Sequence, residues 1–232
     1  SSSDATSFVI DLTIGEFSTT PIWKLKVLKA STPANIPAIV DWGDGERTIV
    51  TESSYVNLEH QYSKSDSYLV RVFGGSCLST ENTSVSNAYR SVCTRLYKFG
   101  SLHKYAQYLF DNSSIQKLDS DFSWGGVQNA QACFLDAKYL SGDVPSFNGS
   151  FVANASYLFR NTKLDTMPEN FTWGNVTDST STYAGCKAMT NIAETLTSEI
   201  LMPNTVTKHS STVNNASPEL RSKFRTDWGG TM

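Results

Sequence analysis

Internal self-similarity at a fixed spacing constrains the fold of this chain more than any other feature. The segment AQYLFDNSSIQKLDSDFSWGGV at 106–127 returns 49 residues later as ASYLFRNTKLDTMPENFTWGNV at 155–176. Apolar, asparagine and Trp-Gly positions coincide in the two segments. Such a repeat is typical of a chain whose units bury their apolar positions only by stacking on one another.

Two further copies lie at half that spacing, at 130–152 and 179–196. One aromatic residue in each unit follows the previous one after 24, 25 and 24 residues, and these residues are Phe110, Phe134, Phe159 and Tyr183. Units of this length favour a solenoid. We therefore expect about four repeat units over residues 96–200.

The units follow the pattern x-x-L-F-x-N-x-x-L-x-x-[LM]-P-x-x-F, which resembles the BspA-type leucine-rich repeat. That family is known from bacterial surface proteins and mycoplasma surface repeats, so the resemblance implies a short solenoid in a surface-exposed protein. Most units lack the cysteine that the family carries after the asparagine, and only Cys186 stands near such a place. Arguments from a cysteine ladder therefore do not carry over.

The first third of the chain shows a different periodicity. Phe8, Ile10, Leu12 and Ile14 alternate with more polar residues, and the stretches IWKLKVL at 22–28 and YLVRVFG at 68–74 alternate in the same way. Alternation with period two predicts half-buried strands. Several short strands separated by turn residues predict a β-sandwich over residues 1–76.

The stretch VDWGDGERTI at 40–49 raises the question of a turn or a metal site. Asp-Gly between β-branched runs is a strong hairpin signal. A calcium loop would need more oxygen ligands at alternating positions than Asp41, Asp44 and Glu46 provide, because Trp42 interrupts the series. We therefore predict a structural turn, with a calcium site as the alternative.

Together with HQY at 60–62 and SYLVRVFG at 67–74, this stretch resembles a PKD domain. The resemblance covers roughly residues 5–75 and implies an immunoglobulin-like fold, found mostly in extracellular, non-catalytic modules. It also implies that Trp42 packs in the core and that Asp44-Gly45, after Gly43, forms the turn.

Residues 77–95 are expected to connect the two parts, and residues 201–232 to close the chain. Ser217 fits a helix N-cap, Pro218 the first helical position, and Gly229 a stop. The apolar residues Leu220, Phe224 and Trp228 then follow at i, i+4 and i+8. This stripe predicts a helix that caps the solenoid, and the alternative is an exposed stripe that binds a partner. The predicted fold class is thus mainly β, an immunoglobulin-like sandwich followed by a leucine-rich solenoid with a terminal helix.

Four cysteines allow two disulfides, of which Cys77–Cys93 would close a short loop, while free buried thiols are the alternative. Seven Asn-x-Ser/Thr sequons are present, at Asn82, Asn112, Asn148, Asn154, Asn170, Asn175 and Asn215. They indicate either a glycosylated extracellular protein or a surface that is rich in serine, threonine and asparagine.

The composition argues against several classes of function. A net charge of −3 with dispersed lysine and arginine gives no reason to expect nucleic acid as a partner. Apolar runs are strand-sized, so we expect no membrane span. No catalytic or phosphate-binding motif occurs, and His103 and His209 lack acidic or cysteine partners at metal-ligand spacing. His60 belongs to the HQY stretch, where a packed or surface role is more typical than a ligand role. We therefore expect no enzyme, no cofactor and no metal.

These patterns lead to a non-catalytic extracellular or surface-exposed protein, on a cell or a virion. The first expectation is a fibril or appendage subunit that binds copies of itself through the strand Phe8–Ile14, added to a neighbour's sheet. The alternative is an adhesin that recognises a glycan or a surface receptor. In that case Trp124 and Trp173 could form a sugar-binding platform, although equivalent aromatic positions in repeats are more typical of a core. A polysaccharide-active enzyme is the third and weakest interpretation.

Overall fold

A computed structural model describes residues 7–14, 22–30, 36–78 and 91–232 of the chain. The protein is mainly β, as expected, and its described residues form three sheets. The largest has the order β4-β3-β6-β1-β8-β9, and the smaller ones have the orders β5-β2-β7 and β10-β11-β12. The strands of the N-terminal part are β1 (Ser7–Ile14), β2 (Ile22–Leu28), β3 (Ala38–Asp41), β4 (Arg47–Val50), β5 (Val56–Gln61), β6 (Asp66–Phe73) and β7 (Ser76–Leu78). Those that follow are β8 (Ser91–Lys98), β9 (Lys117–Ser123), β10 (Ser141–Asp143), β11 (Lys163–Met167) and β12 (Asn191–Ile192).

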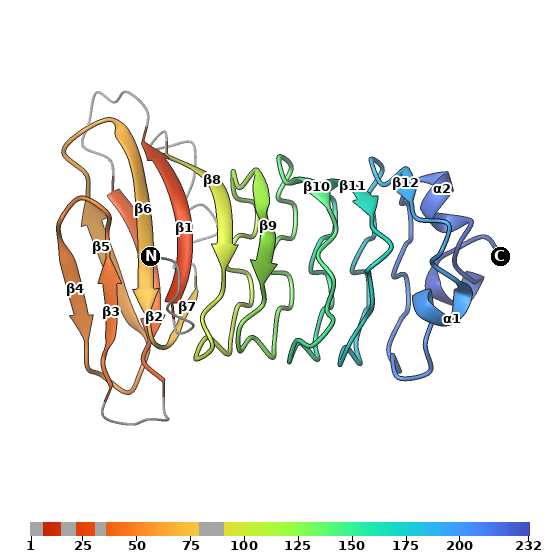
Figure 1. Cartoon of the computed structure of the whole chain (residues 1–232), viewed down its shortest axis with the longest axis horizontal. Coiled ribbons are helices and arrows are strands. Elements are labelled where there is room, and N and C mark those ends of the chain that lie inside the picture. The colour runs from red at the N-terminus through yellow and green to blue at the C-terminus, as the bar shows by residue number, and fades with distance from the viewer. Residues whose placement is uncertain (1–6, 15–21, 31–35, 79–90) are drawn as a thin grey trace.

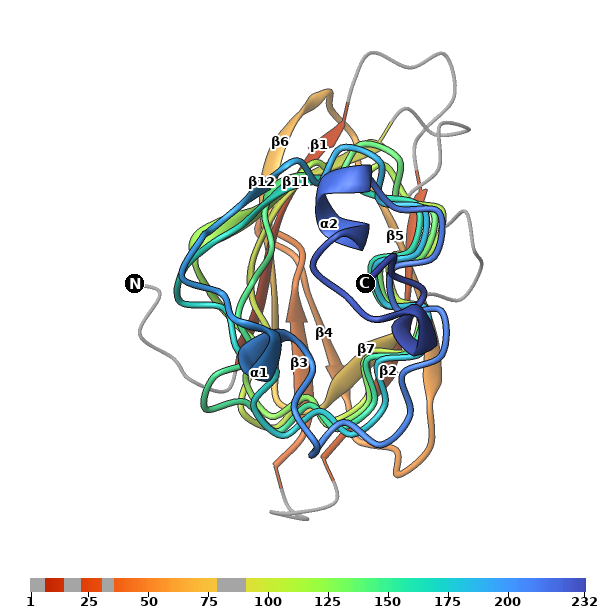
Figure 2. The same cartoon turned by 90° about the vertical axis from the view of Figure 1, so that its right-hand side faces the viewer.

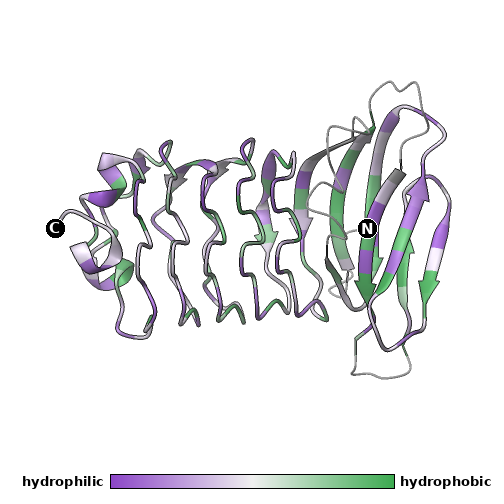
Figure 3. Ribbon diagram, turned by 180° about the vertical axis from the view of Figure 1, so that it is seen from behind, coloured by the Kyte–Doolittle hydropathy of each residue, from purple (hydrophilic) through white to green (hydrophobic). Residues whose placement is uncertain are grey.

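The strands of the N-terminal part have one face in the core, as their alternating sequence predicts. Trp23, Leu25 and Val27 of β2 are buried, and so are Val70 and Val72 of β6. Figure 3 shows the same alternation as bands of hydrophobic and hydrophilic residues along these strands. The burial of such rows of apolar side chains is the main stabilising contribution in this part.

The largest sheet runs without interruption from the N-terminal part into the repeats. Strand β8 pairs antiparallel with β1 on one side and parallel with β9 on the other. The ring of Phe8 in β1 lies 5.8 Å from that of Phe99 and 6.3 Å from that of Phe110. The described ends of the expected connector 77–95 are therefore strands, and the two parts share one core.

The repeats form a stack of parallel turns of the chain, which we call rungs. The rungs are joined by single parallel bridges between Tyr105, Asn129, Asn154, Asp178 and Lys208, in that order. Backbone hydrogen bonds link each rung to the next, such as Phe110 N–H to Cys133 O at 2.8 Å and Phe134 N–H to Leu158 O at 3.0 Å. Figures 1 and 2 show the rungs side by side along the long axis and superimposed when viewed from the C-terminal end.

Each rung contains the same backbone bend two residues after its buried central side chain. The residues at that bend have left-handed φ values, 54° at Asn112, 56° at Asp136, 61° at Asn161 and 71° at Gly185. Asparagine, aspartate and glycine tolerate this conformation better than other residues. The asparagine of the repeat pattern is therefore a backbone requirement.

Two ladders of aromatic rings fill the interior of the rungs. Phe110, Phe134, Phe159 and Tyr183 stack with ring centroids 5.4, 5.5 and 5.8 Å apart. A second ladder contains Phe99, Trp124, Phe147 and Trp173, with centroid distances of 6.1, 5.1 and 5.8 Å. Stacking of equivalent rings explains why the sequence repeats an aromatic residue in each unit.

The stack continues past residue 200, where we expected it to end. Tyr183 N–H donates to Thr212 O at 2.8 Å, and Asn215 has the left-handed φ of 56° found at the bend of the other rungs. Val213 takes the central position and is fully buried. The short helix α1 (Ser198–Leu201) lies between the central residues Tyr183 and Val213 and makes their spacing longer than that between the other rungs. The irregular spacing conceals this rung in the sequence.

The C-terminal segment caps the last rung, but not with the single helix that we predicted. Ser217 is the N-cap and Pro218 begins helix α2 (Pro218–Arg221), which is only one turn long. A 3₁₀ helix (Thr226–Trp228) follows and ends at the left-handed Gly229. The tail folds back so that Thr231 and Met232 donate to carbonyls that a longer helix would use. The apolar residues Leu220, Phe224 and Trp228 are nevertheless all buried.

Candidate ligand-binding site

The stretch around Trp42 is built as a tight turn. Gly43 and Gly45 have φ values of 84° and 97°, and a Cβ atom on Gly43 would lie 2.7 Å from Leu69 O. The Trp42 indole is 1 % exposed and donates to Thr48 Oγ1 at 2.9 Å. These contacts give the stretch a structural role in joining β3 to β4.

The carboxylates of this turn already have partners within the protein. Asp41 accepts hydrogen bonds from Gly43 N–H and from the Arg47 guanidinium. Asp44 accepts from Glu46 N–H at 3.1 Å and lies 2.6 Å from Nε2 of His60. Within the described residues no group of three acidic, histidine or cysteine side chains is placed to hold a metal ion. The geometry therefore does not assemble the calcium alternative.

His60 lies in an aromatic box that positions it against this turn. Its ring stacks on Trp42 at 4.6 Å and meets Tyr62 edge-on at the same distance. Partial burial raises the pKa of Asp44, but the hydrogen bonds from His60 and the backbone outweigh it, so the net pKa is lowered. Through these contacts His60 links β5 to the turn between β3 and β4.

Trp124 and Trp173 do not form the sugar platform considered above. They are 4 % and 1 % exposed, and Phe147 stacks between them. Their indole N–H groups donate to the backbone oxygens of Ser146 and Leu201. The platform prediction is wrong because both side chains belong to the interior ladder.

Both edges of the strand proposed for self-association are already paired within the chain. β1, which contains Phe8, Ile10, Leu12 and Ile14, is hydrogen-bonded to β6 on one edge and to β8 on the other. All four side chains are at most 2 % exposed. A strand with both edges paired cannot add to a neighbouring sheet without unfolding, so this prediction is wrong.

Cys77, Cys133 and Cys186 are buried thiols. Cys77 is free, so the Cys77–Cys93 bridge is not formed, and Cys133 and Cys186 are free as well. Sequence analysis missed the neighbour of Cys77, whose sulfur lies 3.9 Å from Nδ1 of His103. Burial raises the pKa of Cys77 and lowers that of His103 to about 3, which keeps both groups neutral. A neutral, fully buried pair of this kind is unsuited to nucleophilic catalysis.

The sequons lie mostly at the surface. Asn154 is half-buried and its side chain accepts a hydrogen bond from Ser156 N–H. Asn82 lies outside the described residues. The exposed ones are Asn112, Asn148, Asn170, Asn175 and Asn215.

A groove of about 790 Å³ crosses three consecutive rungs, over β9, β10 and the segment 168–170 that follows β11. Asp119, Asp143 and Glu169 give it an acidic lining, and Asn148 and Asn170 add amide groups. Asp119 lies 3.4 Å from Arg95, whereas Asp143 and Glu169 have no ion-pair partner in the described part of the chain. The groove therefore offers several hydrogen-bond acceptors that are not already occupied.

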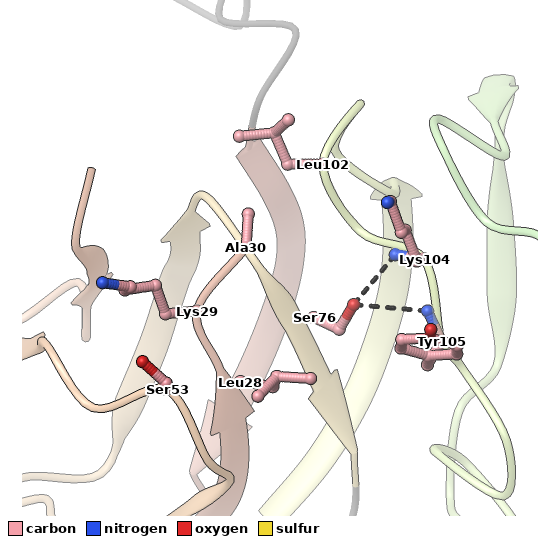
Figure 4. Close-up of a pocket in the computed structure, with 8 residues that line it drawn as sticks. All are labelled: Leu28, Lys29, Ala30, Ser53, Ser76, Leu102, Lys104 and Tyr105. Atoms are coloured by element: carbon pink, nitrogen blue, oxygen red, sulfur yellow. Dashed lines mark hydrogen bonds between the residues drawn. The ribbon is translucent and has the colours of Figure 1, made fainter. Parts of the chain in front are cut away.

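A second hollow lies where the N-terminal part meets the first rung, and we call it the junction pocket. Its volume is about 340 Å³, and Figure 4 shows the residues around it. Leu28, Ala30 and Leu102 provide apolar surface, Lys29 and Lys104 provide ammonium groups, and Tyr105 provides an aromatic ring. No acidic residue lines this pocket among the residues that the structure describes.

The described lining of the junction pocket contains no histidine, cysteine or carboxylate side chain. The described ranges also contain no helix with the length and apolar character needed to cross a bilayer. Comparison of the chain with protein-family models, with curated proteins and with solved structures finds no match.

Proposed function

We propose that this chain is a non-catalytic, extracellular binding module, built from a PKD-like sandwich and a BspA-type leucine-rich solenoid. The sandwich assignment is supported by the packing of Trp42, His60 and Tyr62 beside the WGDG turn. The solenoid assignment is supported by the regular parallel bridges between rungs. Five exposed sequons support an extracellular location.

The groove over β9, β10 and the segment 168–170 is the observation that carries the proposed binding function. Solenoids commonly bind partners along a surface to which each repeat contributes side chains. Here three successive rungs contribute Asp119, Asp143 and Glu169 to one hollow. Such a surface is suited to an extended ligand that crosses several rungs.

A neutral glycan is the ligand class that fits this groove best. Carboxylates accept hydrogen bonds from sugar hydroxyls, and side-chain amides can both accept and donate them. The half-buried ring of Phe122 can pack against a sugar face. The groove is lined by three carboxylates, of Asp119, Asp143 and Glu169, against the single ammonium group of Lys117, so its net negative charge would repel an acidic glycan. The proposal is therefore an adhesin-type module that recognises uncharged carbohydrate.

A glycan array with the full chain tests this proposal. Replacing both Asp143→Asn and Glu169→Gln should weaken binding of neutral glycans by about tenfold or more, because each carboxylate hydrogen bond contributes about 1.5–3 kcal/mol. Asp121→Asn is the matched control, since Asp121 is exposed in β9 but does not line the groove. Absence of neutral-glycan binding, or equal binding by all three proteins, would refute the proposal.

The sample must be characterised before that test. Asn148 and Asn170 line the groove, so N-glycans at these positions would occupy it. Intact-mass measurement and peptide mapping should therefore identify a preparation in which both are unmodified. Full occupancy of both sites in the native protein would contradict a binding role for the groove.

Self-association is a second candidate function, through a different strand from the one first expected. β4 is an end strand of its sheet, and Ile49 in it is 64 % exposed. An unpaired edge with an exposed β-branched residue favours pairing with a second copy. Sedimentation velocity should show concentration-dependent assembly that Ile49→Lys abolishes and Phe151→Lys, at another exposed apolar residue, does not. A monomer at all concentrations would exclude this candidate.

A further inference from the structure

The junction pocket is a separate hollow whose chemistry is opposite to that of the groove. Its wall is fixed by Ser76, which is 3 % exposed and whose hydroxyl oxygen accepts from Lys104 N–H at 2.8 Å and from Tyr105 N–H at 3.2 Å. The backbone of Lys104 is also bound to the second rung, because Gln128 N–H donates to Lys104 O at 2.9 Å. Figure 4 shows both hydrogen bonds of Ser76 at the edge of the pocket. The pocket wall is therefore preorganised.

The charge of the pocket differs in sign from that of the chain. The whole chain has a net charge of −3, yet two of the eight lining residues are lysines and none of those described is acidic. Lys29 already interacts with another group, so the available charge is that of Lys104. Lys104 is exposed and has no ion-pair partner in the described ranges. An anion entering the pocket would thus meet an uncompensated ammonium group.

The remaining surface is apolar and aromatic. Leu28, Ala30 and Leu102 are half-buried, and the ring of Tyr105 is 40 % exposed. An exposed tyrosine beside apolar side chains can pack against the apolar face of a sugar ring. A volume of about 340 Å³ is near the lower limit for small-molecule sites, which suits a single sugar residue and not a chain.

We propose that the junction pocket binds a carboxylated sugar, with the carboxylate on Lys104 and the ring face on Tyr105. The apolar floor disfavours a bare inorganic anion, because such an ion would lose hydration without gaining packing. The ammonium group of Lys104 favours a carboxylated sugar over a neutral one. The junction pocket and the groove share no lining residue, so a failure to bind at one site would not count against binding at the other.

Titration calorimetry on the full chain tests the proposal with four probes. These are N-acetylneuraminic acid, glucuronic acid, neutral N-acetylglucosamine and inorganic sulfate. We expect the two carboxylated sugars to bind and the neutral sugar and sulfate to bind at least about tenfold more weakly. Raising the salt concentration should weaken binding of the carboxylated sugars.

Two variants and two matched controls locate the binding. Lys104→Gln should weaken binding about tenfold or more, and Tyr105→Ala about three- to tenfold, from the usual strengths of a charge-assisted hydrogen bond and an aromatic contact. Lys187→Gln and Tyr139→Ala change exposed residues of the same types outside the pocket and should leave binding unchanged. Both altered pocket side chains are exposed, and thermal melting should verify that each variant folds.

Several outcomes would overturn the proposal. No heat of binding with either carboxylated sugar at millimolar concentration would exclude the site, and unchanged binding by Lys104→Gln would place the ligand elsewhere. Sulfate binding as tight as that of the sugars would indicate an anion site without sugar specificity. Loss of binding on Asp143→Asn, which belongs to the groove, would also contradict the assignment.

Discussion

Phe134 is the residue whose replacement most directly tests the role of the aromatic ladder. Its side chain is fully buried, and its ring is stacked between Phe110 at 5.4 Å and Phe159 at 5.5 Å. Both neighbouring rings are within 3° of parallel to it. Replacing Phe134 with alanine therefore removes a buried side chain and breaks the ladder at its centre.

The expected loss of stability follows from burial and stacking. Truncating a buried phenylalanine to alanine costs about 3–5 kcal/mol. Each stacked pair contributes about 0.5–1.5 kcal/mol beyond area burial, and part of this is already included in the first figure. We expect Phe134→Ala to lower the free energy of unfolding by about 4–5 kcal/mol, a large part of the roughly 5–15 kcal/mol of a typical domain.

Urea denaturation followed by tryptophan fluorescence and circular dichroism measures this loss. Phe134→Leu, which keeps most of the volume but no ring, should lose only about 1–2 kcal/mol. Phe151→Ala is the surface control, because Phe151 is 62 % exposed, and should change stability by less than about 0.5 kcal/mol. A loss for Phe134→Ala no greater than that for Phe151→Ala would refute the argument that the ladder holds the rungs together.

Three further predictions follow from individual contacts. Ser217→Ala should destabilise the protein by about 1–2 kcal/mol in the same urea assay, because Ser217 caps α2 through Leu220 N–H and also donates to a buried carbonyl. An unchanged free energy of unfolding would show that this cap does not stabilise the protein. Gly174→Ala should cost about 1–3 kcal/mol more than Gly149→Ala, since both have positive φ but only at Gly174 would the added Cβ meet a carbonyl oxygen, at 2.1 Å. The lowered pKa of Asp44 stabilises the fold above its ordinary value of 3.8 and ceases to do so as the pH falls through the folded-state value. The stability difference between wild type and Asp44→Asn should therefore shrink on acidification, and a constant difference would contradict it.

The sequence predicts the buried aromatic positions well because the need for burial recurs at a fixed interval. Phe110, Phe134, Phe159 and Tyr183 could be identified in this way, and so could the turn at Asp44-Gly45. The last rung was missed although a signal was present, since Val213 and Asn215 repeat the spacing between Phe159 and Asn161. The insertion of α1 before it changed the interval and concealed the match.

The candidate sites could not be predicted because they depend on contacts between distant segments. Alternation showed that β1 is a strand, but not that β6 and β8 would pair with both of its edges. The equivalent positions of Trp124 and Trp173 did not show which side of the rung they face. The even cysteine count gave no distances, so it could not reveal that Cys77 would lie beside His103. The junction pocket joins residues 28–30 to residues 102–105, which are far apart in the sequence.

Strand β8 joins the antiparallel strands of the first third to the parallel strands of the repeats in one sheet. This continuity should make the connection between the two parts stiff. Bending the repeats away from the first third of the chain would require breaking the pairing of β8 with β1 or with β9, which leaves no hinge among the described strands. A force applied along the stack would reach the first strands through backbone hydrogen bonds and not through a flexible tether. Each additional rung would lengthen this rigid arm by about 4.7–4.9 Å, so the number of repeats sets the reach of the protein.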